Sequence, residues 1–177
     1  MCETPSLDKI TMLKNNLKKI LLNFIVIFII FMVDRVSKIY ILKVAEVANT
    51  VDIYINSYLN FYLIWNKGIA FGLFSFNENF IYNIITFVIT IIIFIVLVMI
   101  VNANGFRKYC LLFVLGGSLG NLVDRIYYSA VPDFIDLHIN DFHWFVFNVA
   151  DIFITLGIMC LILNEIIFNN KKNEKFV

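Results

Sequence analysis

Four long apolar stretches dominate this sequence and limit the folds that it can adopt. They run from Ile20 to Leu42, from Phe80 to Val101, from Gly105 to Val123 and from Trp144 to Phe168. A helix needs about 20 predominantly apolar residues to cross a bilayer, and each stretch approaches or exceeds that length. The chain is 61% hydrophobic with a mean hydropathy of +0.87, which excludes an ordinary soluble or a disordered protein. The sequence therefore predicts a membrane protein with an all-α core of four transmembrane helices.

The segments between these spans predict one compact unit. There is no internal repeat and no low-complexity linker, so residues 1–177 are expected to form a single integral membrane domain with outer segments 44–79 and 126–143. Alternating β-branched and aromatic residues in Val51–Asn56 and Leu59–Trp65 are typical of short strands. We expect a small extracytoplasmic β-sheet between helices 1 and 2.

Basic residues beside the spans predict how the chain is oriented. Four lysines precede the first span, Arg107 and Lys108 separate the second from the third, and Lys171, Lys172 and Lys175 follow the fourth. By the positive-inside rule, both termini are expected in the cytosol. A basic start before an apolar run is also typical of a secretory signal peptide, but no small-x-small cleavage site follows, which favours a membrane span.

Other function classes find little support in the sequence. A net charge of +1 provides no basic surface, so no nucleic-acid partner is expected. Cys2, Cys110 and Cys160 form no CxxC pair, which argues against a disulfide framework or a zinc site. His138 and His143 do not form HExxH and are expected at the membrane interface rather than as ligands. GxSxG and P-loop motifs are absent, and we expect neither metal nor cofactor.

Carboxylates concentrate late in the chain and at one level of the membrane. The window Gly116–Asp151 holds five of the thirteen carboxylates and both histidines. Counted from the nearest cytosolic lysines at about 1.5 Å per residue, Asp34, Asp124 and Asp151 lie roughly 22, 24 and 30 Å deep. Polar groups from three spans thus meet near the outer face of a hydrocarbon core about 30 Å thick. Ionisable residues at such positions indicate a functional site.

Some of these groups have a structural interpretation. Asp34 and Lys38 are four residues apart on one helix face, which favours a structural ion pair. Arg35 and Lys38 can also be helix-end cations whose long side chains snorkel towards the lipid headgroups. The same explanation suits the aspartates poorly, because their side chains are short. Gly116 and Gly120 form a small-xxx-small face that allows a neighbouring helix to approach closely.

Other groups suggest chemistry. Asn121, Asp124 and Arg125 pair a carboxylate with a cation and an amide on one helix, which could hold a polar cavity open. Asn148 and Asp151 share one face near the outer end of the fourth span.

The remaining carboxylates, Asp133 and Asp136, lie just before the fourth span. Two carboxylates in a low-dielectric pocket share a proton, so one can activate water while the other polarises a carbonyl, as in aspartic proteases. Spacing alone leaves open both which carboxylates pair and whether they form a polar packing network instead.

Five ordered motifs resemble those of the lipoprotein signal peptidase (signal peptidase II) family, which are bacterial membrane aspartyl peptidases. They read DRVSK at 34–38, NKGIAF at 66–71, GSLGNLVDR at 117–125, VPDF at 131–134 and FNVAD at 147–151. Ile69, Ser118 and Pro132 depart from the family pattern. Pro132 fixes φ and removes a backbone donor next to Asp133, so the local loop could differ. The resemblance covers residues 20–168.

The resemblance implies a site and a substrate. The family's catalytic pair falls on Asp133 and Asp151, and the surrounding polar shell on Asp34, Lys38, Asn66, Asn121, Asp124, Arg125 and Asn148. The implied substrate is a diacylglyceryl-modified prolipoprotein, which is cut just before its lipidated cysteine. The enzyme is expected to be a monomer in the bacterial cytoplasmic (inner) membrane, in contact with membrane lipid. A proton-coupled carrier and a non-enzymatic membrane adaptor are the alternatives. A carrier usually shows internal repeats and midplane polar groups, and an adaptor leaves the carboxylates unexplained.

Overall fold

The computed structural model describes residues 7–68, 79–140 and 142–173. Helix α1 (Leu7–Ala48) is followed by strands β1 (Asp52–Asn56) and β2 (Leu59–Asn66), then by helices α2 (Asn79–Asn102) and α3 (Gly105–Tyr128). Strands β3 (Val131–Ile139) and β4 (Phe142–Phe147) precede helix α4 (Val149–Asn173). All four helices are long and apolar enough to cross a membrane. The expected fold class, four apolar helices with a small sheet, is confirmed.

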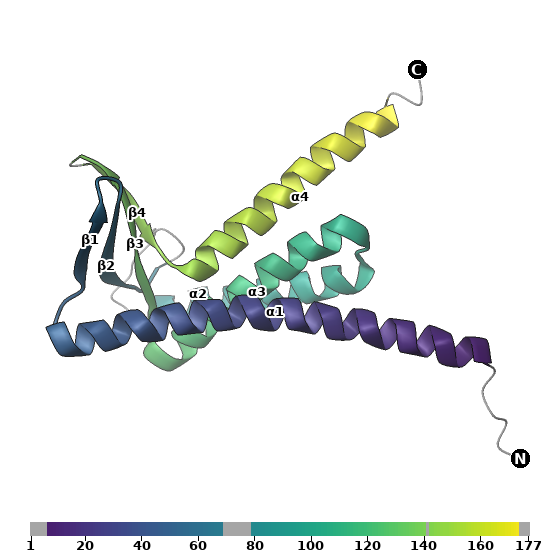
Figure 1. Ribbon diagram of the computed structural model, residues 1–177, viewed down its shortest axis with the longest axis horizontal. Coiled ribbons are helices and arrows are strands. Elements are labelled where there is room, and N and C mark those ends of the chain that lie inside the picture. Colours follow the sequence, from purple (N-terminus) through teal and green to yellow (C-terminus); the bar gives the residue numbers. More distant parts are fainter. Residues whose placement is uncertain (1–6, 69–78, 141, 174–177) are drawn as a thin grey trace, which may run out of the picture.

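The sheet stands at one end of the helices (Figure 1). Its order is β1-β2-β3-β4, with every pair antiparallel. The C-terminal end of α1 and the N-terminal end of α4 lie at the sheet, whereas the N-terminal end of α1 and the C-terminal end of α4 lie far from it (Figure 1). Residues from the end of α1 and from the sheet, including Ile41, Val51 and Phe134, bury an apolar core between them.

The sequence prediction located only half of this sheet. The two predicted strands in the first outer segment correspond to β1 and β2, but β3 and β4 come from residues assigned to the second outer segment and to the start of the fourth span. The fourth helix begins at Val149 and not near Trp144, because the aromatic run Phe142–Phe147 pairs with β3. A hydropathy window cannot separate an apolar strand from the start of an apolar helix. The third helix also continues past Val123 to Tyr128.

Helix α3 lies at the centre of the helical part. About 61% of its membrane-spanning apolar segment is buried, against 11–17% of the corresponding segments of the other three helices. It contacts α1, α2 and α4. The predicted small-residue face of this helix is turned towards α1. A Cβ on Gly116 would lie 2.9 Å from the Ile30 side chain, and a Cβ on Gly120 would lie 2.5 Å from Asp34 Oδ2. These glycines allow α1 to approach closely enough to bring its charged residues against α3.

Pro132 is accommodated inside β3. It lies opposite Trp65 of β2, between the register pairs Asn66 with Val131 and Ile64 with Asp133. Strand β4 pairs with β3 only from Ile135 onward, so no ladder bond to β4 is lost where proline has no N–H. Asp133 therefore lies within β3, paired with Ile64 of β2 beside an irregularity of that strand, rather than in a rearranged loop.

Candidate active site

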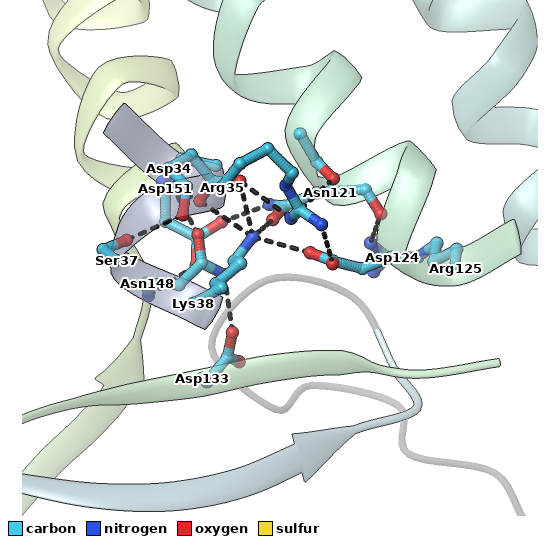
Figure 2. Close-up of polar contacts among 12 residues, drawn as sticks. Asp34, Arg35, Ser37, Lys38, Asn121, Asp124, Arg125, Asp133, Asn148 and Asp151 are labelled. Carbon is cyan, nitrogen blue, oxygen red and sulfur yellow. Dashed lines mark hydrogen bonds and ion pairs between the residues drawn. The ribbon is translucent and has the colours of Figure 1, made fainter. Parts of the chain in front are cut away.

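A buried charge cluster joins α1 to α3 beside the sheet (Figure 2). Lys38 Nζ lies 2.8 Å from Asp34 Oδ1 and 2.7 Å from Asp124 Oδ2, and it donates to Asn121 Oδ1 at 2.9 Å. Lys38 is 1% exposed, and both carboxylates are fully buried. The predicted ion pair between Asp34 and Lys38 is confirmed. The snorkelling interpretation of Lys38 is wrong, because its ammonium group turns inward to two carboxylates.

Arg35 supplies the second cation of this cluster. Its guanidinium lies 2.9 Å from Asp34 Oδ2 and 2.6 Å from Asp124 Oδ1, and it donates to the Gly120 carbonyl at 3.2 Å. Two cations thus balance two buried carboxylates, as buried charges require. The snorkelling interpretation of Arg35 is therefore also wrong, because its guanidinium pairs with Asp124, which lies far away in the chain.

Arg125 does not pair with Asp124, contrary to the grouping suggested by their spacing. Its guanidinium donates instead to the Gly68 carbonyl at 2.8 Å, while Tyr82 donates to the Arg125 carbonyl at 3.0 Å. The Gly68 amide donates to Asn66 Oδ1 at 2.8 Å. Arg125 therefore fixes the turn that follows β2 and, through it, the position of Asn66.

Asn148 and Asp151 form a reciprocal cap at the start of α4. The Asp151 amide donates to Asn148 Oδ1, and the Asn148 amide donates to Asp151 Oδ2, each at 3.2 Å. This is the capping-box arrangement, in which side chains three residues apart satisfy each other's free backbone donors. The second carboxylate oxygen of Asp151 accepts from Asn121 Nδ2 at 2.8 Å. Both Asp151 oxygens are thereby held by α3 and by the helix start.

Asp133 approaches this network from β3 (Figure 2). Its Oδ1 accepts from Asn148 Nδ2 at 2.6 Å, and its Oδ2 accepts from Asn66 Nδ2 at 2.8 Å. Burial, followed by the charge of Asp151, raises the pKa of the Asp133 carboxyl to about 7, although the two amide hydrogen bonds and Lys38 oppose this rise. Asp133 is thus poised to exchange a proton near neutral pH.

Two asparagines connect the carboxylates into one network. Asn148 donates to Asp133 and caps Asp151, and Asn121 accepts from Lys38 and donates to Asp151. All nine residues that the family resemblance assigns to the site are buried around this network: Asp34, Lys38, Asn66, Asn121, Asp124, Arg125, Asp133, Asn148 and Asp151. Residues 69–71 of the NKGIAF motif lie outside the described residues.

Asp136, the other open candidate, is separated from the network by strand geometry. Successive side chains of a strand point to opposite faces, so residues three apart face apart. Asp136 accordingly contacts His143 on β4, at 2.8 Å between Oδ2 and Nδ1. Sequence spacing could not distinguish the two aspartates, because the prediction did not recognise β3 as a strand.

Apolar cavities open beside Asp151 on two sides. One of about 270 Å³ lies between α2, α3 and α4 and is lined by Ile93, Asn121, Arg125, Asp151 and Ile154. Another, of about 220 Å³, is lined by Leu137 and Phe147 of the sheet and by Asp151 and Leu156 of α4. Asp151 therefore lines two cavities whose other walls are mainly aliphatic and aromatic side chains.

The fold and the buried polar centre define a multi-pass membrane protein whose polar site lies where its helices meet a small sheet. Comparison with known proteins specifies the class further. The family described as Signal peptidase (SPase) II matches residues 26–167. The chain belongs to the signal peptidase II family, and it is a peptidase.

Named relatives agree with this assignment. The chain is 57% identical over 163 residues to the lipoprotein signal peptidase of Pelagibacter ubique (strain HTCC1062), with coverage of 92% of this chain and 98% of that protein. It is 40% identical to the lipoprotein signal peptidase of Anaplasma phagocytophilum (strain HZ), over 85% of this chain and 95% of the relative. With relatives of this kind, the carrier and adaptor alternatives no longer apply.

Solved structures support the fold. A bacterial membrane enzyme determined by the in meso method at 1.9 Å resolution aligns with a TM-score of 0.59 and 27% identity, over 80% of this chain and 90% of that one. A second bacterial membrane enzyme, at 2.3 Å resolution, aligns with a TM-score of 0.64 at 24% identity, over 85% and 90% of the two chains.

Proposed function

We propose that this peptidase removes the signal peptide from diacylglyceryl-modified prolipoproteins by cutting the peptide bond just before the lipidated cysteine. Asp133 and Asp151 are the catalytic pair. In this mechanism, the ionised carboxylate takes a proton from water, which attacks the scissile carbonyl, and the protonated carboxyl donates a hydrogen bond to the carbonyl oxygen. The proton then moves to the leaving amine, so the reaction consumes one water and no cofactor.

The observation that carries this proposal is the shared hydrogen-bonding of the two carboxylates. Asn148 donates to Asp133 at 2.6 Å and caps the helix start that holds Asp151. The pKa of Asp133, raised to about 7 by burial and by the charge of Asp151, fits a pair that holds one proton at working pH. The pair, rather than either residue, therefore titrates as the functional unit.

The charge cluster acts as support. Lys38, held by Asp34 and Asp124, donates to Asn121, and Asn121 donates to Asp151. Arg125 holds the turn after β2, and Asn66 in that turn donates to Asp133. These residues position the pair, and the two apolar cavities beside Asp151 receive the signal peptide and the acyl chains.

The orientation follows from charge and depth. With basic residues beside the cytosolic ends of the helices, both termini lie in the cytosol and the sheet lies outside. The pair is then at the outer face of the membrane, where the acyl chains hold the scissile bond.

The test is cleavage of a purified, diacylglyceryl-modified prolipoprotein in detergent, followed as a gel shift. Asp133→Asn and Asp151→Asn are expected to abolish the shift, while the exposed-site control Glu46→Gln retains it. Unmodified precursor is the substrate control and remains uncut. Full cleavage by either aspartate variant, at equal protein level and with a normal thermal transition, would refute the catalytic pair.

A further inference from the structure

A second cluster of potential ligands lies on the sheet, formed by Asp136, His138 and His143. Their ligand atoms all lie within 4.8 Å of one another. His143 Nδ1 is 2.8 Å from Asp136 Oδ2, and His138 Nδ1 is 3.7 Å from the same oxygen. The proposed peptidase mechanism uses none of these groups. We propose that this cluster binds one divalent first-row transition-metal ion, with Zn²⁺ as the preferred ion.

The strand register explains why these three residues meet. Asp136 and His138 are two residues apart on β3 and therefore share one face of the sheet. A register shift between Leu137 and His138 places His143 of β4 directly opposite His138, where regular pairing would have placed Trp144. The two imidazole rings stack at 5.2 Å between centroids with planes 28° apart. The bulge therefore brings both rings to the same carboxylate.

The separations suit a tetrahedral ion. Metal–nitrogen and metal–oxygen bonds to zinc are about 2.0–2.2 Å long, so two ligand atoms on one tetrahedral ion lie about 3.3–3.6 Å apart. The observed distances from Asp136 Oδ2 to the two ring nitrogens, 2.8 and 3.7 Å, lie on either side of this range. Small side-chain rotations would bring both to the bonding geometry. Two imidazoles with one carboxylate suit zinc and its neighbours and not magnesium or calcium, which prefer oxygen ligands.

Buried atoms at the cluster are left without partners. Within residues 7–68, 79–140 and 142–173, neither Asp136 Oδ1 nor His138 Nδ1 makes a hydrogen bond, and the same holds for Asn60 Oδ1 on the neighbouring strand. Asp136 is 3% exposed and His138 is 9% exposed. Buried polar atoms without a hydrogen bond are costly, and a cation binds the lone pairs of a carboxylate oxygen and of a neutral ring nitrogen at once.

The cluster is also reachable from outside. Asp136 and His143 line a cavity of about 410 Å³, together with Asp52, Asn60 and Tyr62 of the first hairpin. The His143 side chain is 57% exposed. An ion can therefore enter without unfolding the sheet and can keep a water as its fourth ligand. Bound there, it would join β3 to β4 and fix the register of the strand that carries Asp133.

The experiment is metal binding by the full-length protein, purified in detergent and stripped with a chelator. Co²⁺ is the spectroscopic probe and Zn²⁺ its competitor. We expect one Co²⁺ per chain, with visible d–d absorption of tetrahedral strength, displacement by Zn²⁺ and a rise in the thermal transition on Zn²⁺ addition. Loss of one ligand in His143→Gln or His138→Gln should weaken binding at least about tenfold and remove most of the thermal rise.

Matched variants keep the test decisive. His143→Gln alters an exposed side chain and keeps an amide donor for the buried Asp136, so the metal-free thermal transition of the variant is measured first and the rise on Zn²⁺ addition is taken from that value. Asp52→Asn, a carboxylate in the same cavity but outside the three-residue cluster, should bind Co²⁺ as wild type does. Since His138 and His143 are the only histidines, no other imidazole can substitute. Absence of binding by wild type, unchanged binding by His143→Gln, or the near-ultraviolet charge-transfer bands of cobalt thiolate would each overturn the proposal.

Discussion

Replacing Asn148 should separate the capping role of this residue from its role beside Asp133. The side chain is fully buried, its Oδ1 accepts from the Asp151 amide, and its Nδ2 donates to Asp133 at 2.6 Å. Serine retains a good N-cap oxygen but cannot reach Asp133, whereas alanine loses both contacts. N-cap replacement by alanine costs about 1 kcal/mol, so Asn148→Ala should unfold about 2–4 °C below Asn148→Ser.

Cleavage should respond differently from stability. Leaving a buried hydrogen-bonding atom of Asp133 unpaired costs about 1–3 kcal/mol, which corresponds to a cleavage rate about 5- to 150-fold lower in both variants. The hydrogen bond from Asn148 lowers the pKa of Asp133, so its loss should also move the alkaline limb of the pH–rate profile to higher pH. The assays are gel-shift kinetics on lipidated precursor from pH 5 to about 9 and thermal unfolding in detergent. Wild-type rate and pH profile in the stably folded Asn148→Ser variant would refute the reasoning.

Three further predictions address the pair, the charge cluster and the helix contact. The pKa of Asp133 is raised from 3.8 to about 7, so between these pH values the folded protein binds more protons than the unfolded chain. Thermal stability should therefore fall as the pH rises from about 4 to about 7, and it should fall less in Asp133→Asn. Cleavage by wild type should decline above about pH 7. Lys38→Met should lower the free energy of unfolding by about 3–5 kcal/mol in denaturation experiments, because Asp34 and Asp124 would retain only Arg35 as a cation. Adding Asp124→Asn should restore part of the lost stability. A double variant no more stable than Lys38→Met would count against the charge cluster. Gly117→Ala places a Cβ 2.5 Å from the Ala150 carbonyl oxygen and should therefore lower the stability of the fold by about 1–3 kcal/mol. Thermal unfolding measures this loss, and the gel-shift assay should show reduced cleavage. Wild-type values in both assays would show that α4 can shift freely.

Local patterns carried much of the fold prediction. Apolar run length located four helices, and alternation located β1 and β2 within about one residue. The same signals failed at β4, whose aromatic residues 142–147 continue almost directly into α4 and therefore read as one span. Strand β3 was not predicted, because its proline and charged residues interrupt the apolar pattern.

The candidate site shows the same division. The i,i+4 pairing of Asp34 with Lys38 was visible in the sequence, because it depends only on helix geometry. The FNVAD motif placed Asn148 and Asp151 at capping-box spacing, but only the structure shows the reciprocal hydrogen bonds. The cation partners of Asp124 were predicted wrongly, since Arg35 and Lys38 come from another helix. The histidines were expected at the interface, although their positions around Asn140 could have indicated a hairpin with facing side chains.

The sequence by itself determined the class of protein and the number of membrane helices, and its resemblance to a family supplied the residues that we propose for the site. These properties depend on composition and on short spacings, which the chain displays directly. The tertiary structure decided which of Asp133 and Asp136 faces Asp151, which cations balance Asp124 and how Asn148 joins two carboxylates. Such contacts depend on strand parity and on the close packing of α1 and α4 against α3, and the contact between Lys38 and Asp124 joins residues 86 positions apart.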